Sequence, residues 1–101
     1  MNKLKQKRKA FISGKVSSKK WEDAHWLFNA GERWLRKHGY ATVNPTKICD
    51  RNWSWWHCMY VCLRELSKCD TIAMLHDWKH SRGAKIEYAF ALLTFKKIIY
   101  I

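Results

Sequence analysis

The sequence contains no run of apolar residues that approaches the roughly 20 required to cross a bilayer as a helix. Apolar residues nevertheless make up 48% of its 101 positions, which is enough for a folded globular domain. The lysine-rich start of the chain is not followed by the apolar core of a secretory signal. We therefore expect a cytoplasmic protein with one domain, covering residues 9–101, and no membrane partner.

CxxC pairs are absent as well. Cys58 and Cys62 fall one helical turn apart in an amphipathic segment, and the other two cysteines are Cys49 and Cys69. This spacing favours reduced thiols packed in the core over zinc ligands. A site built from His57, Cys58 and Cys62 would need ligands on incompatible helix faces. We expect no metal and no cofactor.

Acidic side chains are few. The chain has 8 of them against 20 lysines and arginines, which gives a net charge of +12, and residues 1–20 hold eight of the bases and no acid. We predict a flexible basic tail over residues 1–8. Such a tail can bind nucleic acid through residues 1–9 by releasing counterions, or serve solubility alone. Lys15, Lys19 and Lys20 follow the first expected strand, where they would attract a phosphate.

Short apolar runs alternate with helical periodicity along the chain. Strands are expected at residues 10–12, 40–43, 71–75 and 98–101, and helices at 21–38, 54–68 and 81–95. The first helix should end at Gly39 and present one buried face, formed by Ala24, Leu27, Phe28, Gly31, Leu35 and His38. A polar, tryptophan-rich loop should connect Pro45 to Ser54.

This alternation predicts a three-layer α/β fold, because right-handed crossovers give a parallel sheet with helices on both faces. Ligands of such sheets bind beyond the carboxyl ends of the strands. The residues expected to gather at that edge are Ser13, Gly14, Asn44, Trp78, Ser81 and Glu87.

The segment from Ser81 to Glu87 carries the strongest functional signal. Ser81 is a good helix N-cap, and the free backbone amides beside it favour an anion such as phosphate. Glu87 lies between Gly83 and Ala91 at four-residue spacing, so its carboxylate shares a face with small residues that normally pack against a sheet. The alternative is a solvated glutamate paired with a lysine.

Several short motifs occur in order along residues 9–101. They are Phe11-Ile12-Ser13-Gly14, Gly39-Tyr40, Val43-Asn44-Pro45, Cys69-Asp70, Trp78, and Ser81-Arg82-Gly83-Ala84 with Glu87 and Ala89. This set resembles the DUF4406 family, whose members are similar to nucleoside 2-deoxyribosyltransferases and deoxynucleoside 5′-monophosphate N-glycosidases. The resemblance implies a flavodoxin-like fold with strand order 2-1-3-4 and a pocket for a nucleoside or nucleotide.

The resemblance also implies roles for single residues. Glu87 would be the nucleophile that attacks the anomeric carbon of deoxyribose. Ser13 and Gly14 would lie along the sugar and phosphate, and Ser81 would contact the phosphate. Gly83 would help to frame the sugar and phosphate. Arg82 and Lys85 would clamp the phosphate, although a solvated first turn is the ordinary role of each. A homo-oligomer, dimeric or larger, is implied too.

One departure from the enzymes concerns Cys62, which replaces an aspartate that helps the base to leave. A thiol is a poor general acid. Three outcomes stay open: weak activity, substitution by Asp77 or His76, or binding without turnover. The function expected is thus N-glycosidic cleavage or transfer on deoxyribonucleotides, the alternatives being a catalytically silent nucleotide-binding module and nucleic-acid association through the tail.

The tryptophans have two interpretations of equal weight. Trp53, Trp55 and Trp56 would either stack on a base or form an oligomer interface.

Overall fold

The computed structural model describes residues 8–15, 21–50 and 52–101. Its strands are β1 (Lys9–Ser13), β2 (Ala41–Val43), β3 (Thr71–Met74) and β4 (Lys97–Tyr100). They form one sheet in the order β2-β1-β3-β4, and every neighbouring pair is parallel. The predicted parallel sheet and its strand order are confirmed.

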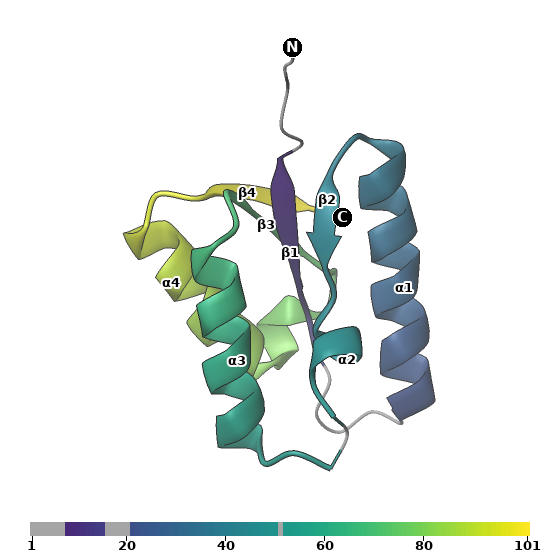
Figure 1. The fold of residues 1–101 in the computed structure, drawn as a ribbon, viewed down its shortest axis with the longest axis vertical. Coiled ribbons are helices and arrows are strands. Elements are labelled where there is room, and N and C mark those ends of the chain that lie inside the picture. The colour runs from purple at the N-terminus through teal and green to yellow at the C-terminus, as the bar shows by residue number, and fades with distance from the viewer. Residues whose placement is uncertain (1–7, 16–20, 51) are drawn as a thin grey trace.

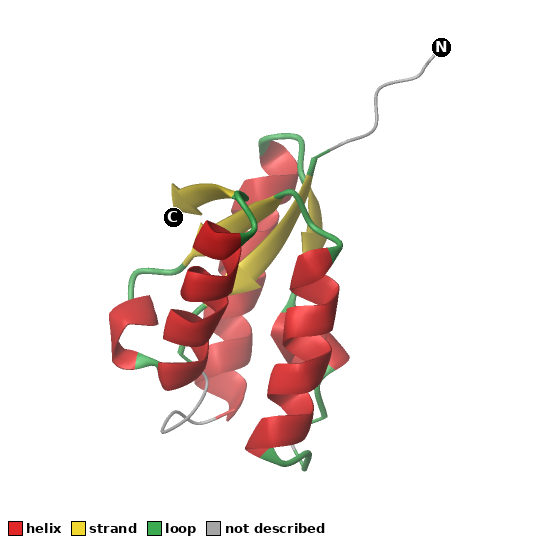
Figure 2. Ribbon diagram, turned by 90° about the vertical axis from the view of Figure 1, so that its left-hand side faces the viewer, coloured by secondary structure: helices red, strands yellow, loops and turns green. Residues whose placement is uncertain are grey.

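The helices cover both faces of this sheet. They are α1 (Trp21–Lys37), α2 (Pro45–Ile48), α3 (Trp55–Ser67) and α4 (Arg82–Leu93), with a short 3-10 helix, η1 (Trp78–His80), before α4. Figure 1 shows α1 on one side of the sheet and α3 with α4 on the other. Figure 2 views the molecule from the α3 and α4 side, with the sheet behind these helices and α1 at the back. The arrangement is a three-layer, flavodoxin-like α/β fold, as predicted.

Strand β1 directs its side chains alternately to the two faces, as any strand does. Ala10 and Ile12 belong to the core beneath α1, where they join Phe28 and Leu35. Phe11 belongs to the opposite core, beneath α3 and α4. Ser13 is two residues further along and therefore lies on the α3 and α4 side, at the carboxyl end of the strand.

Three local predictions were wrong. The expected loop after β2 begins with the short helix α2, because Asn44 caps it with a side-chain acceptor for the Thr46 amide and Pro45 suits its first turn. The short helix η1 was not anticipated either. His38 is exposed and stacks on Trp34 instead of completing the buried face of α1. Gly39 does end the helix, with a φ of +91°.

The expectation of four reduced thiols was also wrong. Cys49 and Cys58 form a disulfide with a Cα–Cα distance of 5.7 Å. The prediction failed because helix α2 was not anticipated. This helix has Cys49 at its C-cap and so places Cys49 beside α3. Cys62 and Cys69 are free and buried.

Within the described residues, no helix has both the length and the apolar character needed to cross a membrane. Residues 1–7 of the expected basic tail lie outside the described part of the chain, as do Lys19 and Lys20.

Candidate functional site

Ser13 and Glu87 meet at the carboxyl end of the sheet. The Ser13 hydroxyl donates a hydrogen bond of 2.6 Å to Oε1 of Glu87, and both residues are buried. Ser13 ends β1, while Glu87 lies in the middle of α4, which packs against β1 and β3. The spacing in the sequence predicted that Glu87 lies on the side of its helix that faces the sheet. The structure agrees, because Ala84 and Ala91 on the same side of α4 are buried too.

The buried position changes the acidity of Glu87. Burial raises its pKa to about 7, although the hydrogen bond from Ser13 pulls the pKa the other way. Within the described part of the chain, Ser13 is its only hydrogen-bond partner, and that bond reaches Oε1. The structure therefore holds a buried carboxyl group that is oriented by one hydrogen bond and whose pKa is raised toward neutrality.

The N-terminus of α4 lies on the same element as Glu87. Ser81 is the N-cap, and its hydroxyl oxygen accepts from the Ala84 amide at 3.1 Å. The cap that the sequence predicted is confirmed. Arg82 is exposed and its guanidinium lies over the ring of Trp55, 5.1 Å from the centroid, which is a cation–π geometry.

Gly83 allows α4 to approach α3 closely. A Cβ at this position would lie 3.0 Å from the sulfur of Met59 and 3.8 Å from the indole nitrogen of Trp55. Gly83 also lies near Ser81, since the Ser81 hydroxyl oxygen would be 3.9 Å from the same Cβ position. Helix packing thus accounts for this glycine without a ligand.

The loops after β1 and β3 lie against one another. A Cβ at Gly14 would fall 2.7 Å from the end of the Leu75 side chain and 3.2 Å from the carboxylate of Asp77, so a larger residue here would force the Leu75 side chain to move. The backbone amide of Lys15 donates to the same carboxylate at 3.1 Å. The predicted convergence of these two loops is therefore confirmed, and it places Asp77 at the edge where Ser13 ends.

Trp78 is held by an aromatic stack. Its ring lies 4.6 Å from that of Tyr88, with an angle of 26° between the planes. It is half-buried and packs against the core beneath α3 and α4. This contact is a structural role that the sequence did not indicate.

Asn44 belongs to a different cluster. Its amide donates to Asn29 at 2.9 Å and to Oε1 of Glu32 at 3.2 Å, while its carbonyl oxygen accepts from Thr46. Each polar atom of its side chain is thus engaged between α1 and α2. The structure places Asn44 with Glu32, and shows no contact between it and Glu87 among the described residues.

Glu32 is the centre of that second cluster. It is buried, and it forms ion pairs of 2.8 Å with both Arg36 and Lys47. Burial alone would raise the pKa of Glu32, but hydrogen bonds from Lys47, Thr42 and Asn44 outweigh it and lower the pKa to about 2. This carboxylate stays ionised across the physiological range.

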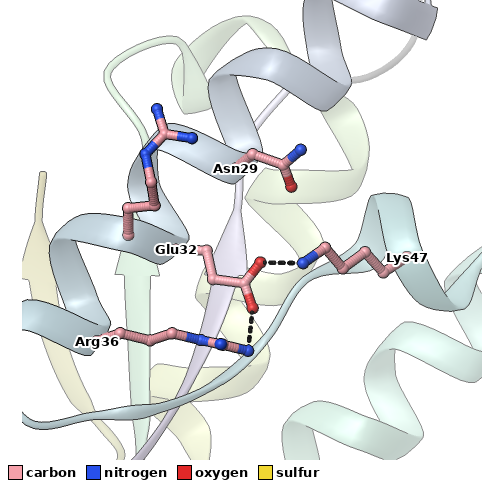
Figure 3. A pocket seen from close by; sticks show the side chains of 5 residues that line it. Asn29, Glu32, Arg36 and Lys47 are labelled. Atoms are coloured by element: carbon pink, nitrogen blue, oxygen red, sulfur yellow. Dashed lines mark hydrogen bonds and ion pairs between the residues drawn. The ribbon is translucent and has the colours of Figure 1, made fainter.

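A surface pocket of about 220 Å³ adjoins Glu32. Figure 3 shows Lys47 and Arg36 reaching the two carboxylate oxygens of Glu32 from opposite sides, with Asn29 beside them. The sequence analysis missed this cluster. The spacing of Glu32 and Arg36, four residues apart on α1, was the signal that could have found it.

Cys62 lies close enough to Glu87 to interact electrostatically with it. Burial raises the pKa of the Cys62 thiol far above its usual range, and the Glu87 and Glu65 carboxylates add to the rise. The thiol therefore stays protonated at neutral pH. It is a weak acid beside a carboxyl group that titrates near pH 7.

The strand order and the helices on both faces define a flavodoxin-like α/β protein. A family model, DUF4406, described as a domain of unknown function, matches residues 8–100. The chain belongs to this family. A search of curated proteins found no match.

Proposed function

We propose that this protein binds a deoxynucleoside or its monophosphate at the carboxyl edge of the sheet and cleaves or transfers its N-glycosidic bond through Glu87. The resemblance of the sequence motifs to nucleoside 2-deoxyribosyltransferases and to deoxynucleoside monophosphate N-glycosidases suggested this chemistry. The structural observation that supports it most is the buried hydrogen bond between Ser13 and Glu87.

A buried carboxyl group whose orientation is fixed by a hydrogen bond has the chemistry that this reaction needs. In the proposed first step, Oε2 of ionised Glu87 forms a bond to C1′ of the sugar while the bond from C1′ to the base breaks. The electron pair goes to the base, which takes up a proton from solvent, and the water that attacks in the second step returns a proton to solvent. Water, or a second base, then displaces Glu87 and restores the carboxylate.

The pKa near 7 bears on the role of Glu87 as nucleophile. Glu87 must be ionised to attack, and roughly half of it is ionised at neutral pH. The hydrogen bond from Ser13 stabilises the ionised form and fixes the orientation of the carboxylate. Ser13 is thus a positioning residue in this proposal.

The start of α4 supplies the phosphate part of the proposed site. The first backbone amides of an α-helix have no partner within the helix, and the helix dipole favours an anion there. The Ser81 hydroxyl accepts from Ala84 and keeps its own hydrogen to donate. A 5′-phosphate at this point and a sugar beside Glu87 would both lie along α4.

The test is release of free base. Wild-type protein is incubated with each deoxynucleoside and each deoxynucleoside monophosphate, and the products are separated by chromatography. We expect release from at least one of them, and loss of release in Glu87→Gln, which keeps the size of the side chain. Glu65→Gln on α3 is the matched control and should retain activity. An inactive wild type, or an active Glu87→Gln protein, contradicts the enzymatic proposal.

A second candidate function is nucleotide binding without turnover, and the observation that favours it is Cys62. The protonated thiol beside Glu87 is a poor proton donor to a departing base. A ligand that binds only the folded state raises the melting temperature. This candidate predicts a higher melting temperature with a nucleotide and no released base, and base release excludes it.

A further inference from the structure

Three cysteine sulfurs lie together between α2 and α3. The Sγ atom of Cys62 is 3.7 Å from that of Cys49 and 3.8 Å from that of Cys58. All three sulfurs fall within 4.8 Å of one another, and Cys49 and Cys58 are bonded in this structure. The fourth cysteine, Cys69, is separate, since its thiol donates to the Glu65 carbonyl at the other end of α3.

The elements that hold these sulfurs impose their convergence. Cys58 and Cys62 are four residues apart on α3, so their side chains point to the same side of the helix. Cys49 is the C-cap of α2 and approaches that side from the adjoining segment. Cys49 and Cys62 are buried, while Cys58 is half-buried and gives the cluster access to solvent.

The position of Cys62 is ill suited to exchange with the disulfide. An attacking thiolate must approach along the axis of the sulfur–sulfur bond, so it must be near one sulfur and far from the other. Cys62 is almost equally distant from both. It lies beside the bond, and the three sulfurs form a triangle with Cys62 at its apex.

Two edges of that triangle have the length found in a metal–thiolate site, and the third is the Cys49–Cys58 bond, which must be reduced before these two sulfurs can separate. Sulfurs bound to a tetrahedral Zn²⁺ at about 2.3 Å lie about 3.8 Å apart, and the two distances from Cys62 are 3.7 and 3.8 Å. We propose that Cys49, Cys58 and Cys62 together bind one thiophilic metal ion, Zn²⁺ or Cu(I), when the disulfide is reduced. Soft thiolate ligands select these ions over hard cations such as Mg²⁺.

The oxidised and the metal-bound forms are two states of one cluster. Two thiols of a reductant deliver two electrons and two protons to the Cys49–Cys58 bond, and they become a disulfide themselves. The metal ion then displaces the thiol protons to solvent, and each thiolate forms one bond to the metal. A solvent molecule completes a tetrahedral Zn²⁺ site, whereas Cu(I) is satisfied by three sulfurs.

The experiment uses Co²⁺ as a spectroscopic probe for Zn²⁺, and Cu(I) in a separate competition titration. Full-length protein is reduced with a phosphine, freed of metal and titrated without oxygen. We expect a thiolate-to-cobalt charge-transfer band that saturates at one equivalent and disappears when Zn²⁺ is added. The oxidised protein should show no such band. Whichever of Zn²⁺ and Cu(I) binds more tightly in competition is the ion assigned.

Two variants separate the cluster from the other buried thiol. Cys62→Ala removes one ligand and should weaken binding at least about tenfold, while Cys69→Ala should leave it unchanged. Circular dichroism establishes that both are folded. If Cys62→Ala does not fold, a second measurement takes the place of this variant. Zn²⁺ should protect Cys58 from alkylation in the reduced wild-type protein. Absence of both the charge-transfer band and Cu(I) binding, equal effects of the two variants, or no protection of Cys58 would overturn the proposal.

Discussion

Ser13 and Glu87 are 74 positions apart in the sequence, and their side chains are joined by a buried hydrogen bond of 2.6 Å. The bond connects the end of the central strand β1 to the middle of α4. It also fixes a carboxyl group that has a pKa of about 7 at the edge of a parallel sheet, where ligands of this architecture bind.

The raised pKa of Glu87 makes stability fall as the pH rises. The unfolded chain releases the proton near pH 4.5 and the folded chain near pH 7, so the folded state holds more protons between these values. The free energy of unfolding should therefore decrease by about 3 kcal/mol across this window through Glu87 alone. Glu87→Gln removes this dependence, so the variant gains stability relative to wild type as the pH rises.

Urea unfolding of both proteins at intervals from pH 4 to pH 8 measures this difference. Other titrating groups are common to the two proteins and cancel in the comparison. Parallel stability curves for wild type and Glu87→Gln would show that Glu87 is not held in its neutral form.

Glu32 should act with the opposite sign and at lower pH. Its pKa is lowered from 4.5 to about 2, so the folded state binds fewer protons than the unfolded state between these values. Wild type should lose about 2 kcal/mol as the pH falls through this window, a value reduced because Arg36 and Lys47 are exposed. Glu32→Gln should show no such loss, and should be less stable than wild type at pH 6.

Glu65→Gln is the control for both carboxyl variants. Among the described residues Glu65 pairs with Lys68, at 3.4 Å and with both side chains partly exposed, so its replacement should cost less than about 1 kcal/mol. If Glu65→Gln lowers the stability as much as Glu32→Gln does, the ion pairs of the buried Glu32 contribute no more to stability than a partly exposed pair.

Ser13→Ala should raise the pKa of Glu87 further, because the hydrogen bond from Ser13 favours the ionised carboxylate. The alkaline shift can be measured by titrating the Glu87 carboxyl carbon in an NMR spectrum. The variant should also lose about 1 to 3 kcal/mol of stability, since a buried acceptor loses its donor. Ser67→Ala removes an exposed hydroxyl bonded to the Arg64 carbonyl and should change neither quantity. A pKa that is unchanged or lower in Ser13→Ala contradicts this assignment.

Periodicity was sufficient to predict the sheet and the long helices. The runs at residues 10–12 and 71–75 become buried strands because apolar β-branched and aromatic residues fill both sides of them. The periodicity of residues 54–68 predicts one apolar side formed by Trp55, Met59, Cys62, Leu63 and Leu66. In α3, Met59, Cys62 and Leu66 are buried, while Trp55 and Leu63 are half-buried. Helix α2 escaped prediction because it is only four residues long, which is too short for a periodic pattern.

The sequence predicted the positions of those site residues that are determined by the order of strands and helices along the chain. Ser13 ends β1 and Glu87 faces the sheet from α4, so topology alone brings them to one edge. Asn44 also follows a strand, but β2 is the edge strand next to α1 and α2, and its side chain is engaged there by Glu32 and Asn29. Side-chain pairing of this kind depends on rotamers that a linear pattern does not contain.

The basic tail gives a prediction that is independent of the Glu87 site. If residues 1–9 bind nucleic acid, the affinity for a single-stranded oligonucleotide should fall steeply with salt. Deletion of residues 1–7 removes Lys3, Lys5 and Lys7 and leaves β1 intact, so it should reduce the slope of log K against log salt by about 2. Fluorescence anisotropy measures the slope, and a length-matched variant with three glutamines is the control. An unchanged slope would exclude the tail as the binding element.

The most direct test of the central claim is a crystal structure of the Glu87→Gln protein soaked with a deoxynucleoside monophosphate. We predict that C1′ of the sugar lies next to the side chain of residue 87 and that the phosphate contacts Ser81 and the first amides of α4. A nucleotide bound only in the pocket beside Glu32, or a site at residue 87 that stays closed by protein side chains, would contradict the account.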